Sequence, residues 1–543
     1  MLTIALAIIS KRVVFSLLVG IAAAILILLP TQQVYRDFVG ETFTAQGYWQ
    51  YIGTQFVSQI AEEHLWQSLI DSDHLRVFAF TVLLGIQVAL IHRSGGMQGI
   101  VLWARPLARS RRGGQFLTWL LGLVVFIDDY ANTLLLGSTM RPITDRLRIS
   151  REKLAFLVDS TAAPVSGLAL VSTWVATEMS TMEEGYAGAN VDVGSNTLTL
   201  FVQTIPFRFY ILYALAFVFL CAILGRDFGP MLRAEQKAAD SEPVAPEGHA
   251  AQDQNPRALN AILPIFITVA VVIGLIAFTG KAASGVTDFP EITQWQEWGN
   301  IIGQGDSYLG LVYGAAAGLA CILGLISVQG ELRSNEVKQA AIAGAVHVFP
   351  ALVILWLAWT LSALTGEGYL ATGTFLANEI SELNVPAAIM PTVIFLLASA
   401  IAFSTGTSWG TMTILMPIAI PLVYGLIAND MGGEYPAPDH YLLIASVGSV
   451  LAGAIFGDHC SPISDTTILS SRSSDCDHIA HVRTQIPYAL TIGTIAVLCG
   501  TLPAGFGVKA IYLLPVGLAS MVLVLLLIGR PIKTSTSEEQ VAN

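Results

Sequence analysis

The sequence predicts an all-α polytopic membrane protein built as an inverted-topology repeat, with broken helices or hairpins at the membrane midplane. Of its 543 residues, 54% are hydrophobic and only 12% are charged, whereas soluble proteins average about 25% charged residues. The mean hydropathy is +0.65. One soluble core of this size is excluded, because such cores stop growing at about 250–300 residues. The chain has no basic tract that would suit nucleic acid.

Apolar stretches long enough to cross a bilayer recur along the whole chain. A spanning helix needs about 20 apolar residues. Ten stretches are candidates: 13–30, 76–92, 154–175, 199–225, 258–279, 307–328, 339–364, 440–456, 486–506 and 508–529. Lys11 and Arg12 precede the first stretch and no small-residue cleavage pattern follows it, so we expect an uncleaved first helix. Polar residues interrupt 114–140 and 386–427, which we expect to be broken helices or helical hairpins.

Basic and acidic residues are segregated between the loops. Basic clusters lie at 11–12, 105–112, 141–153, 226–257, 333–338, 472–483 and 530–533. Acid-rich loops lie at 37–73, 178–192, 288–306, 367–382 and 430–439. Because cytoplasmic loops carry an excess of Lys and Arg, we expect both termini in the cytoplasm. The loop 226–257 is expected to be a disordered cytoplasmic linker.

The two halves share an order of elements but have opposite predicted orientations. The first repeat, 13–279, begins inside, and the second, 307–529, begins outside. Short sequence matches occur in the same order in both halves: 139–143 with 414–418, and 163–166 with 461–464. Transporters with inverted repeats place their binding sites at the midplane, where helices are broken.

Four segments carry polar groups at the expected membrane depth: 126–133, 159–166, 403–411 and 457–467. A carboxylate at the bilayer centre costs at least about 2.5–3.5 kcal/mol, so these aspartates must face one another, water or a cation. Hydroxyls, carboxylates and carbonyls freed beside Pro or Gly are oxygen ligands that suit Na⁺ and protons. The candidate binding residues in these segments are Asp128, Asp129, Asn132, Asp159, Thr161, Ser166, Thr405, Ser408, Asp458, His459, Ser461, Ser464, Asp465 and Thr466.

Structural roles are open alternatives for several of these residues. Asp128 and Asp129 could cap a half-helix at a hairpin tip, and Asp159 could be a helix N-cap. The hydroxyl-rich run 404–411 could bond its own backbone. Two isolated groups are expected to be structural as well. We expect His347 to be a satisfied core histidine and Arg208 to lie near a helix end, with its charge directed to water.

The stretch 452–471 resembles the signature of NhaC-type sodium/proton antiporters, in the wider ion transporter superfamily. Residues 126–134, 141–142 and 159–164 resemble the first-half motif of the same family, and the resemblance extends from about 76 to 529. It implies Na⁺/H⁺ exchange across a bacterial inner membrane. It assigns this function to Asp128, Asp129, Asn132, Asp159, Asp458, His459, Ser461, Ser464, Asp465 and Thr466.

The expected function is therefore Na⁺/H⁺ antiport at a carboxylate site by alternating access, without a cofactor or enzymatic activity. A carboxylate that binds either Na⁺ or H⁺, but not both, exchanges the two. The expected Na⁺ ligands are Asp458, Ser461, Ser464 and Asp465. We expect Asp129 or Asp159 to lie opposite them and His459 to modulate the response to pH. The expected partners are the lipid bilayer, Na⁺ and H⁺, without nucleic acid, and a homodimer is an open possibility.

Two other function classes compete with antiport. A Na⁺- or H⁺-coupled carrier of a small organic solute, such as a hydroxy acid or amino acid, would use Thr405, Ser408 and Trp409 to line a pocket. An intramembrane metalloenzyme would use the group Asp458, His459, Cys460, Cys476, His478 and His481. The last two histidines are three residues apart rather than the four of a zinc helix, and no Glu base accompanies them.

Overall fold

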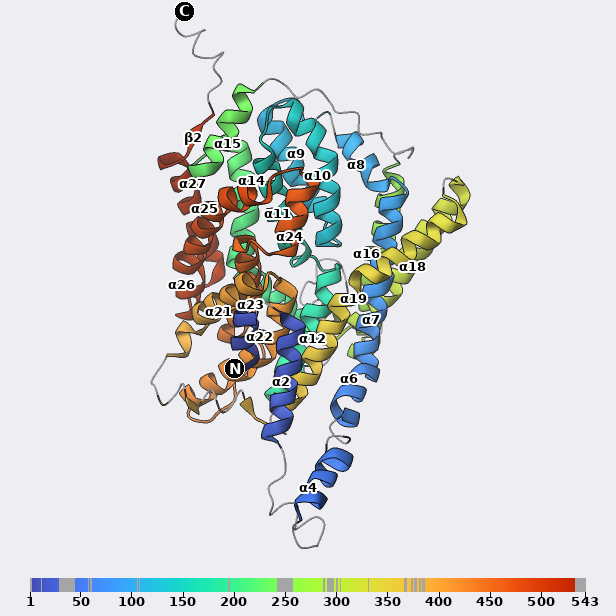
Figure 1. Cartoon of the computed structure of the whole chain (residues 1–543), viewed down its shortest axis with the longest axis vertical. Coiled ribbons are helices and arrows are strands. Elements are labelled where there is room, and N and C mark those ends of the chain that lie inside the picture. The colour runs from blue at the N-terminus through green and yellow to red at the C-terminus, as the bar shows by residue number, and fades with distance from the viewer. Residues whose placement is uncertain are drawn as a thin grey trace, which may run out of the picture.

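The computed structural model is a bundle of α-helices whose long axes run in broadly similar directions (Figure 1). It describes residues 2–532 except for 11, 29–43, 57, 59–60, 105, 107, 194–195, 242–256, 287–288, 291–296, 299–300, 303, 331, 366–368, 373–374, 376–377, 380–381 and 383–385. Two short strands, β1 (Arg226–Asp227) and β2 (Arg530–Pro531), pair antiparallel and join the middle of the chain to its C-terminal part.

The helices follow the chain in two long series. The first comprises α1 (Leu2–Ser10), α2 (Val13–Ile27), α4 (Ala45–Tyr51), α6 (Gln67–Ile70), α7 (Ser72–Arg93), α8 (Gly96–Ala104), α9 (Arg111–Val124), α10 (Asp129–Arg146), α11 (Arg151–Ser166), α12 (Thr173–Gly188), α13 (Thr197–Thr204), α14 (Phe209–Leu224), α15 (Gly229–Asp240) and α16 (Leu259–Ser284). The second comprises α18 (Ser307–Gln329), α19 (Ser334–Thr365), α21 (Met390–Thr405), α22 (Ser408–Asp430), α23 (Tyr441–Cys460), α24 (Asp465–Ser473), α25 (His478–Ala496), α26 (Leu502–Gly505) and α27 (Ala510–Leu527). Short 3-10 or π segments lie at Ile52–Phe56, Ala61–Trp66, Ile205–Phe207, Ala387–Ile389 and Val497–Thr501.

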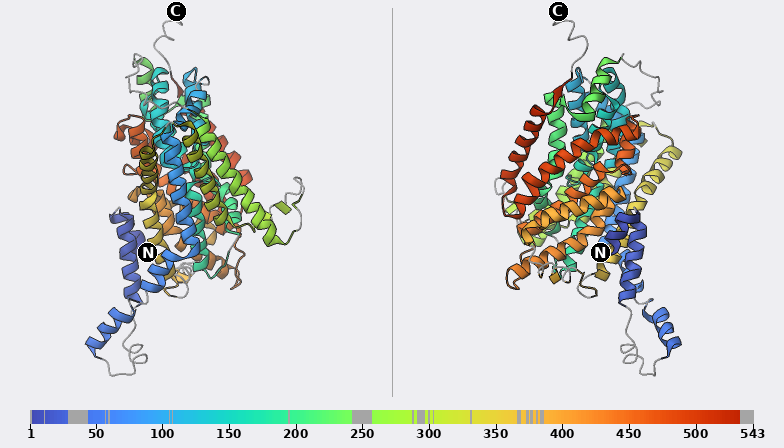
Figure 2. Two further views of the ribbon diagram at one scale, coloured as in Figure 1. Left: turned by 90° about the vertical axis from the view of Figure 1, so that its right-hand side faces the viewer. Right: turned by 60° about the vertical axis from the view of Figure 1, so that its left-hand side comes forward.

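Nine helices among the described residues are long and apolar enough to cross a membrane. The number is ten if Thr197–Phe207 and Phe209–Leu224, which meet at a bend of 54°, form one span. The bundle is elongated in the two further views as well (Figure 2). These helices confirm the predicted class, an all-α multi-pass membrane protein. The inverted relation of the two halves stays a prediction.

The interrupted stretch 114–140 is a pair of helices, as predicted. It forms α9 and the start of α10, separated by a short non-helical break. Asn132 of α10 donates hydrogen bonds of 2.9 Å to the carbonyls of Gly122 and Val125 in and just after α9. This amide satisfies backbone groups that the break leaves open, and it holds the two helices against each other.

The second interrupted stretch, 386–427, is also a pair of helices, α21 and α22. Gly406 ends α21 with a φ of +70°, and a Cβ there would lie 2.4 Å from the carbonyl oxygen of Ile463. Both the backbone conformation and the close approach therefore favour glycine at this turn. The next residue, Thr407, caps α22 by accepting a hydrogen bond from the N–H of Gly410 at 3.3 Å.

The predicted span 154–175 is wrong in its second part, because the chain breaks between α11 and α12. After Ser166 the chain turns, and Ser172 caps the new helix by accepting hydrogen bonds of 3.2 Å from two N–H groups of its first turn. The Ser172 hydroxyl also donates to the carbonyl of Ser166 at 2.7 Å. Hydropathy alone did not reveal this break, since apolar residues continue through it.

The predicted external loop 178–192 is also wrong over most of its length, which forms the end of α12. Glu178 is 1% exposed and pairs at 2.8 Å with Arg208, which is fully buried. Arg208 also donates to the carbonyl of Gly167 and lies 4.5 Å from the ring centre of Phe201. Arg208 therefore does not direct its charge to water. A buried acid can lie inside the protein when it has a buried cationic partner. The segment resembled a loop in sequence because its acids were visible there and the partner of Glu178 was not.

The start of the predicted linker 226–257 is ordered, contrary to expectation. It forms β1 and α15, which dock on the end of the bundle near the C-terminus (Figure 1). Asp227 of β1 pairs with Lys153 of α11 at 2.6 Å, and both side chains are buried. Burial, together with repulsion by Asp227, raises the pKa of Glu235 in α15. The part 242–256 lies outside the described residues.

Candidate functional site

The signature stretch 452–471 comprises the end of α23, a tight turn and the start of α24. Pro462 lies in the turn and has no N–H with which to continue a helix. Ser464 then caps α24 with its side-chain oxygen. This break places Asp458 and Asp465 on different helices, and the two carboxyl groups lie in different surroundings.

Asp458 of α23 and Asp159 of α11 form an enclosed carboxylate pair, with exposures of 2% and 0%. Two neighbouring residues of α24 hold one carboxylate each. Thr466 Oγ1 donates to Asp458 Oδ2 at 2.9 Å, and Thr467 Oγ1 donates to Asp159 Oδ2 at 3.0 Å. The two carboxylates are close enough to repel each other when ionised. These four residues and Gln485 are called the enclosed site below.

Gln485 of α25 connects the enclosed site to two histidines. Its Nε2 donates to Asp159 Oδ2 and, at 2.9 Å, to the carbonyl of His459. Its Oε1 lies 2.9 Å from His481 Nε2, and because an amide oxygen only accepts, that nitrogen carries the proton. On the other side, His459 Nδ1 lies 3.0 Å from the hydroxyl of Tyr210. The carboxylate pair is therefore held by side chains that are themselves fixed by further hydrogen bonds.

Each carboxylate of the enclosed site keeps one oxygen without a partner. Asp159 Oδ1 and Asp458 Oδ1 are buried and accept no hydrogen bond from the described residues. An ionised oxygen buried without compensation is strongly unfavourable. A proton would neutralise it, and so would a cation such as Na⁺, because hard cations take oxygen ligands. The arrangement can therefore bind either a proton or a cation at the same oxygens.

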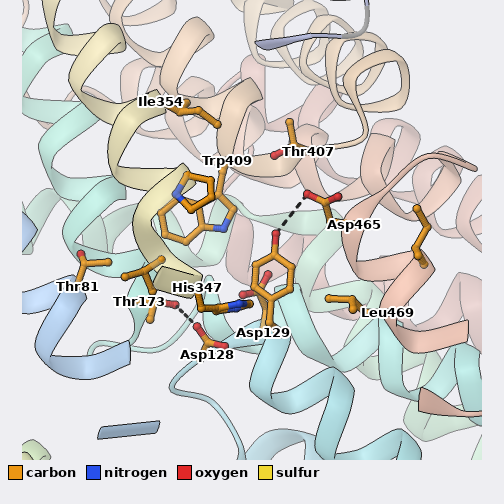
Figure 3. Close-up of a pocket in the computed structure, with 14 residues that line it drawn as sticks. Thr81, Asp128, Asp129, Thr173, His347, Ile354, Thr407, Trp409, Asp465 and Leu469 are labelled. Atoms are coloured by element: carbon orange, nitrogen blue, oxygen red, sulfur yellow. Dashed lines mark hydrogen bonds between the residues drawn. The ribbon is translucent and has the colours of Figure 1, made fainter. Parts of the chain in front are cut away.

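Three other predicted carboxylates line a cavity of about 320 Å³ (Figure 3). Asp128 and Asp129 lie at the start of α10, and Asp465 lies at the start of α24. Thr173 Oγ1 donates to Asp128 Oδ2 at 3.2 Å, and the Tyr130 hydroxyl donates to Asp465 Oδ2 at 3.4 Å. The first two carboxylates are buried, whereas Asp465 is exposed. This space is called the acidic cavity below.

Several predicted binding residues use their hydroxyls to bond the backbone. The hydroxyls of Thr161 and Thr405 donate to carbonyls one turn earlier in their own helices, at 2.9 and 2.8 Å. Ser408 donates to a carbonyl of α23 at 3.3 Å, and Ser461 donates to the carbonyl of Phe403 at 2.8 Å. The bonds of Ser408 and Ser461 hold α21, α22 and α23 to one another, whereas those of Thr161 and Thr405 lie within single helices.

The remaining predicted residues lie around these two places. Ser464 contacts the Thr466 hydroxyl at 3.1 Å and so supports the residue that holds Asp458. Asn132 and Ser166 are fully buried, and in each the side-chain oxygen makes no hydrogen bond with the described residues. The four predicted Na⁺ ligands are thus divided between the enclosed site, the turn after α23 and the acidic cavity.

Sequence reasoning missed several residues that contact the candidate aspartates. Gln485, which donates to Asp159 and bonds His481 one turn away in α25, lies just before the predicted span 486–506, so no predicted span contained it. Thr467 is adjacent to a predicted residue, and Thr173 follows the break that hydropathy did not reveal. His347 is not a core histidine, because it is exposed and lines the acidic cavity.

The residues weighed for a metalloenzyme make other contacts. The Nδ1 atoms of His478 and His481 lie 3.1 and 2.9 Å from the hydroxyl of Ser471, and the Cys476 thiol donates to a backbone carbonyl. Within the described part of the chain, no group of three or more His, Cys, Asp or Glu side chains is arranged to hold a metal ion.

Comparisons with known proteins identify the family and the fold of the chain. Residues 165–502 match the model of the Na⁺/H⁺ antiporter family. An uncharacterized protein of Haemophilus influenzae is 33% identical over 93% of this chain and 90% of its own length. An uncharacterized Na⁺/H⁺ antiporter of the same organism is 35% identical over 28% of this chain and 30% of its own length. The fold resembles the YdaH transporter of Alcanivorax borkumensis, with a TM-score of 0.52, 16% identity, and coverage of 90% of this chain and 97% of that one. This chain belongs to the Na⁺/H⁺ antiporter family.

Proposed function

We propose that the protein exchanges Na⁺ for H⁺ at the enclosed site. The observation that supports this most directly is the pair of buried oxygens, Asp159 Oδ1 and Asp458 Oδ1, that accept no hydrogen bond from the described residues. Removing an ionised carboxylate from water requires a compensating partner. A proton and Na⁺ are alternative partners for the same oxygens, so binding one releases the other.

Exchange then requires that the enclosed site opens to one side of the membrane at a time. We infer that α11, α23 and α24 move against their neighbours, because these helices supply the carboxylates and the threonines that hold them. Inverted halves, 13–279 and 307–529, and cytoplasmic termini in a bacterial inner membrane belong to the same proposal.

Exchange can be measured with purified protein in liposomes, with Na⁺ gradients, a pH-sensitive dye and no organic solute present. We expect Na⁺-driven proton flux from the wild-type protein and background flux from Asp458→Asn and Asp159→Asn. The matched control is Asp430→Asn, which changes an exposed carboxylate at the end of α22 and should retain the wild-type rate. Wild-type flux from Asp458→Asn would disprove the assignment of the site.

A second candidate function is supported by the acidic cavity, whose volume of about 320 Å³ exceeds what one ion requires. A Na⁺- or H⁺-coupled carrier of an organic solute would use such a space. The same liposome measurement separates the candidates. Proton flux that appears only after an organic solute is added would favour the coupled carrier over the antiporter.

A further inference from the structure

The acidic cavity has polar groups toward both ends and apolar walls between them. Figure 3 shows Asp128, Asp129 and His347 gathered at one end, with Trp409 and Asp465 toward the other. The walls between them are apolar side chains of α19 and α24: Val348, Pro350, Ile354, Ile468 and Leu469. Apolar walls do not stabilise a bare or hydrated Na⁺, whereas a molecule with an apolar body binds more favourably when it covers them.

The charges that line the cavity select the sign of its ligand. Three carboxylates line it, and its described lining includes neither lysine nor arginine. Arg12 lines an adjoining hollow of about 520 Å³ instead, which shares Thr407 and Asp465 with the cavity. A ligand that carried a carboxylate would therefore be repelled, because like charges at short range are unfavourable in a partly buried site.

Asp129 supplies a buried acceptor for a positively charged group. Its side chain is 1% exposed, and its Oδ1 accepts no hydrogen bond from the described residues. Asp129 is among the residues that line the cavity (Figure 3). A primary ammonium has three donors, so it can bond this oxygen while it faces the neighbouring acids.

Aromatic rings stand beside the carboxylates. Trp409 packs edge-on against Trp174, with ring centres 5.5 Å apart, and Tyr130 packs edge-on against His347 at 4.9 Å. The Trp409 Nε1–H has no hydrogen-bond partner among the described residues. Indole and phenol faces attract ammonium groups and also cover apolar carbon.

We infer that the acidic cavity binds a small organic ammonium compound with an apolar body, such as an arylalkylamine. The ammonium group lies against Asp129, and the body lies between Trp409 and the walls of α19 and α24. This inference goes beyond ion exchange at the enclosed site and concerns a different set of side chains.

A charge series of nearly constant shape tests the inference: 2-phenylethylamine, phenylalanine and 3-phenylpropionate, as cation, zwitterion and anion. Each is titrated into the purified full-length protein, and binding is followed by tryptophan fluorescence and by calorimetry. We expect the amine to bind at least about tenfold more tightly than the zwitterion, since the one added carboxylate lies close to the carboxylates of the cavity, and we expect the anion not to bind. Equal or tighter binding of phenylalanine or phenylpropionate, or no binding of any of the three, would overturn the inference.

Variants locate the site of binding. Trp409→Ala should weaken amine binding by about 5- to 30-fold, because the apolar body loses the indole surface that it covers. Asp129→Asn should weaken it by at least about tenfold, because a charge-assisted bond becomes a neutral one. The matched control is Trp103→Ala, since Trp103 of α8 is 79% exposed and does not line the cavity. Amine binding that is unchanged in Trp409→Ala and Asp129→Asn would also overturn the inference.

Calorimetry still measures amine binding if a substitution changes only the tryptophan fluorescence. Circular dichroism melting identifies a variant that fails to fold, and Trp409→Phe then replaces Trp409→Ala, with a smaller expected loss. Solute-free Na⁺/H⁺ exchange is measured on the same wild-type preparation. Exchange without amine binding rejects only this inference, and amine binding without exchange rejects only the function proposed for the enclosed site.

Discussion

The enclosed site and the acidic cavity contain the same chemical groups in opposite surroundings. Asp458 is 2% exposed and accepts a hydrogen bond from Thr466. Asp465, seven residues later, is exposed and accepts a long hydrogen bond of 3.4 Å from Tyr130. On one continuous helix, residues seven apart lie on nearly the same face. The turn at Pro462 separates them, so that two acids of one short motif have different neighbours.

This difference determines what each carboxylate can do. In the enclosed site, a lost hydrogen bond leaves a buried group unsatisfied, which costs about 1–3 kcal/mol. At Asp465, whose side chain is exposed, water can replace a lost partner at little cost. Substitutions of the same kind should therefore have large effects at Asp458 and small effects at Asp465.

Replacing the carboxylates themselves should give the largest contrast. Asp458→Asn should lower Na⁺-driven proton flux by at least about 100-fold, because it removes the charge that binds Na⁺ and the titrating group together. Asp465→Asn should lower it by only about two- to fivefold, since its carboxylate faces water. Flux is measured in proteoliposomes at several Na⁺ concentrations. Equal losses in the two variants would contradict the separation of the two sites.

Removing the amide that links the enclosed site to its histidine should have the next largest effect. Gln485→Leu leaves Asp159 and His481 without their shared partner, so the half-saturating Na⁺ concentration should rise by about 10- to 100-fold. Gln87→Leu is the control, because this equally buried amide bonds Thr268, away from both sites. A similar rise in both variants would indicate general loss of structure.

A matched pair of threonines tests the comparison with minimal change in shape. Thr466→Val removes a 2.9 Å bond to Asp458, and Thr173→Val removes a 3.2 Å bond to Asp128. We expect the first to raise the half-saturating Na⁺ concentration by about 5- to 50-fold and the second by less than about threefold, because only Asp458 belongs to the enclosed site. The half-saturating Na⁺ concentration again reports the effect, and a larger shift for Thr173→Val would reverse the interpretation.

Two tyrosines should give the smallest differences. Tyr210→Phe leaves His459 Nδ1, beside the enclosed site, without its 3.0 Å partner. We expect the exchange rate to fall about three- to tenfold and its pH profile to be displaced. Tyr130→Phe removes only the long bond to an exposed carboxylate, and its rate should stay within about twofold of the wild type. The pH dependence of exchange from about pH 6 to 9 distinguishes them. Identical profiles for all three proteins would show that His459 is not coupled to exchange.

Most of the fold followed from the apolar pattern, and two of the errors share one cause. The segment after Ser172 contains Glu178, and a stretch with acids resembles an external loop in sequence. Its partner Arg208 is 30 positions away, and only their contact at 2.8 Å explains how both charges are buried. The docking of β1 on α11 was hidden in the same way, because Asp227 and Lys153 form a buried ion pair.

The sequence pointed to the acids of the enclosed site and of the acidic cavity but not to their grouping. Asp159 and Asp458 were both expected at a binding site, and the structure places them together. Asp465 was expected to bind the same Na⁺ as Asp458, but it lines the acidic cavity instead. Gln485 and Thr467 were absent from the prediction because an amide or a hydroxyl in an apolar helix has no distinctive pattern.

The sequence by itself determined that the chain is a multi-pass helical membrane protein with acids inside its bundle. Long apolar runs have few alternatives, since backbone groups in a bilayer must be satisfied within each helix. Only the tertiary structure decided which of those acids share a site. Asp159 is bonded by Thr467 and Gln485, which lie 308 and 326 positions away along the chain. Contacts over such separations depend on how helices pack and where they break, which no local pattern specifies.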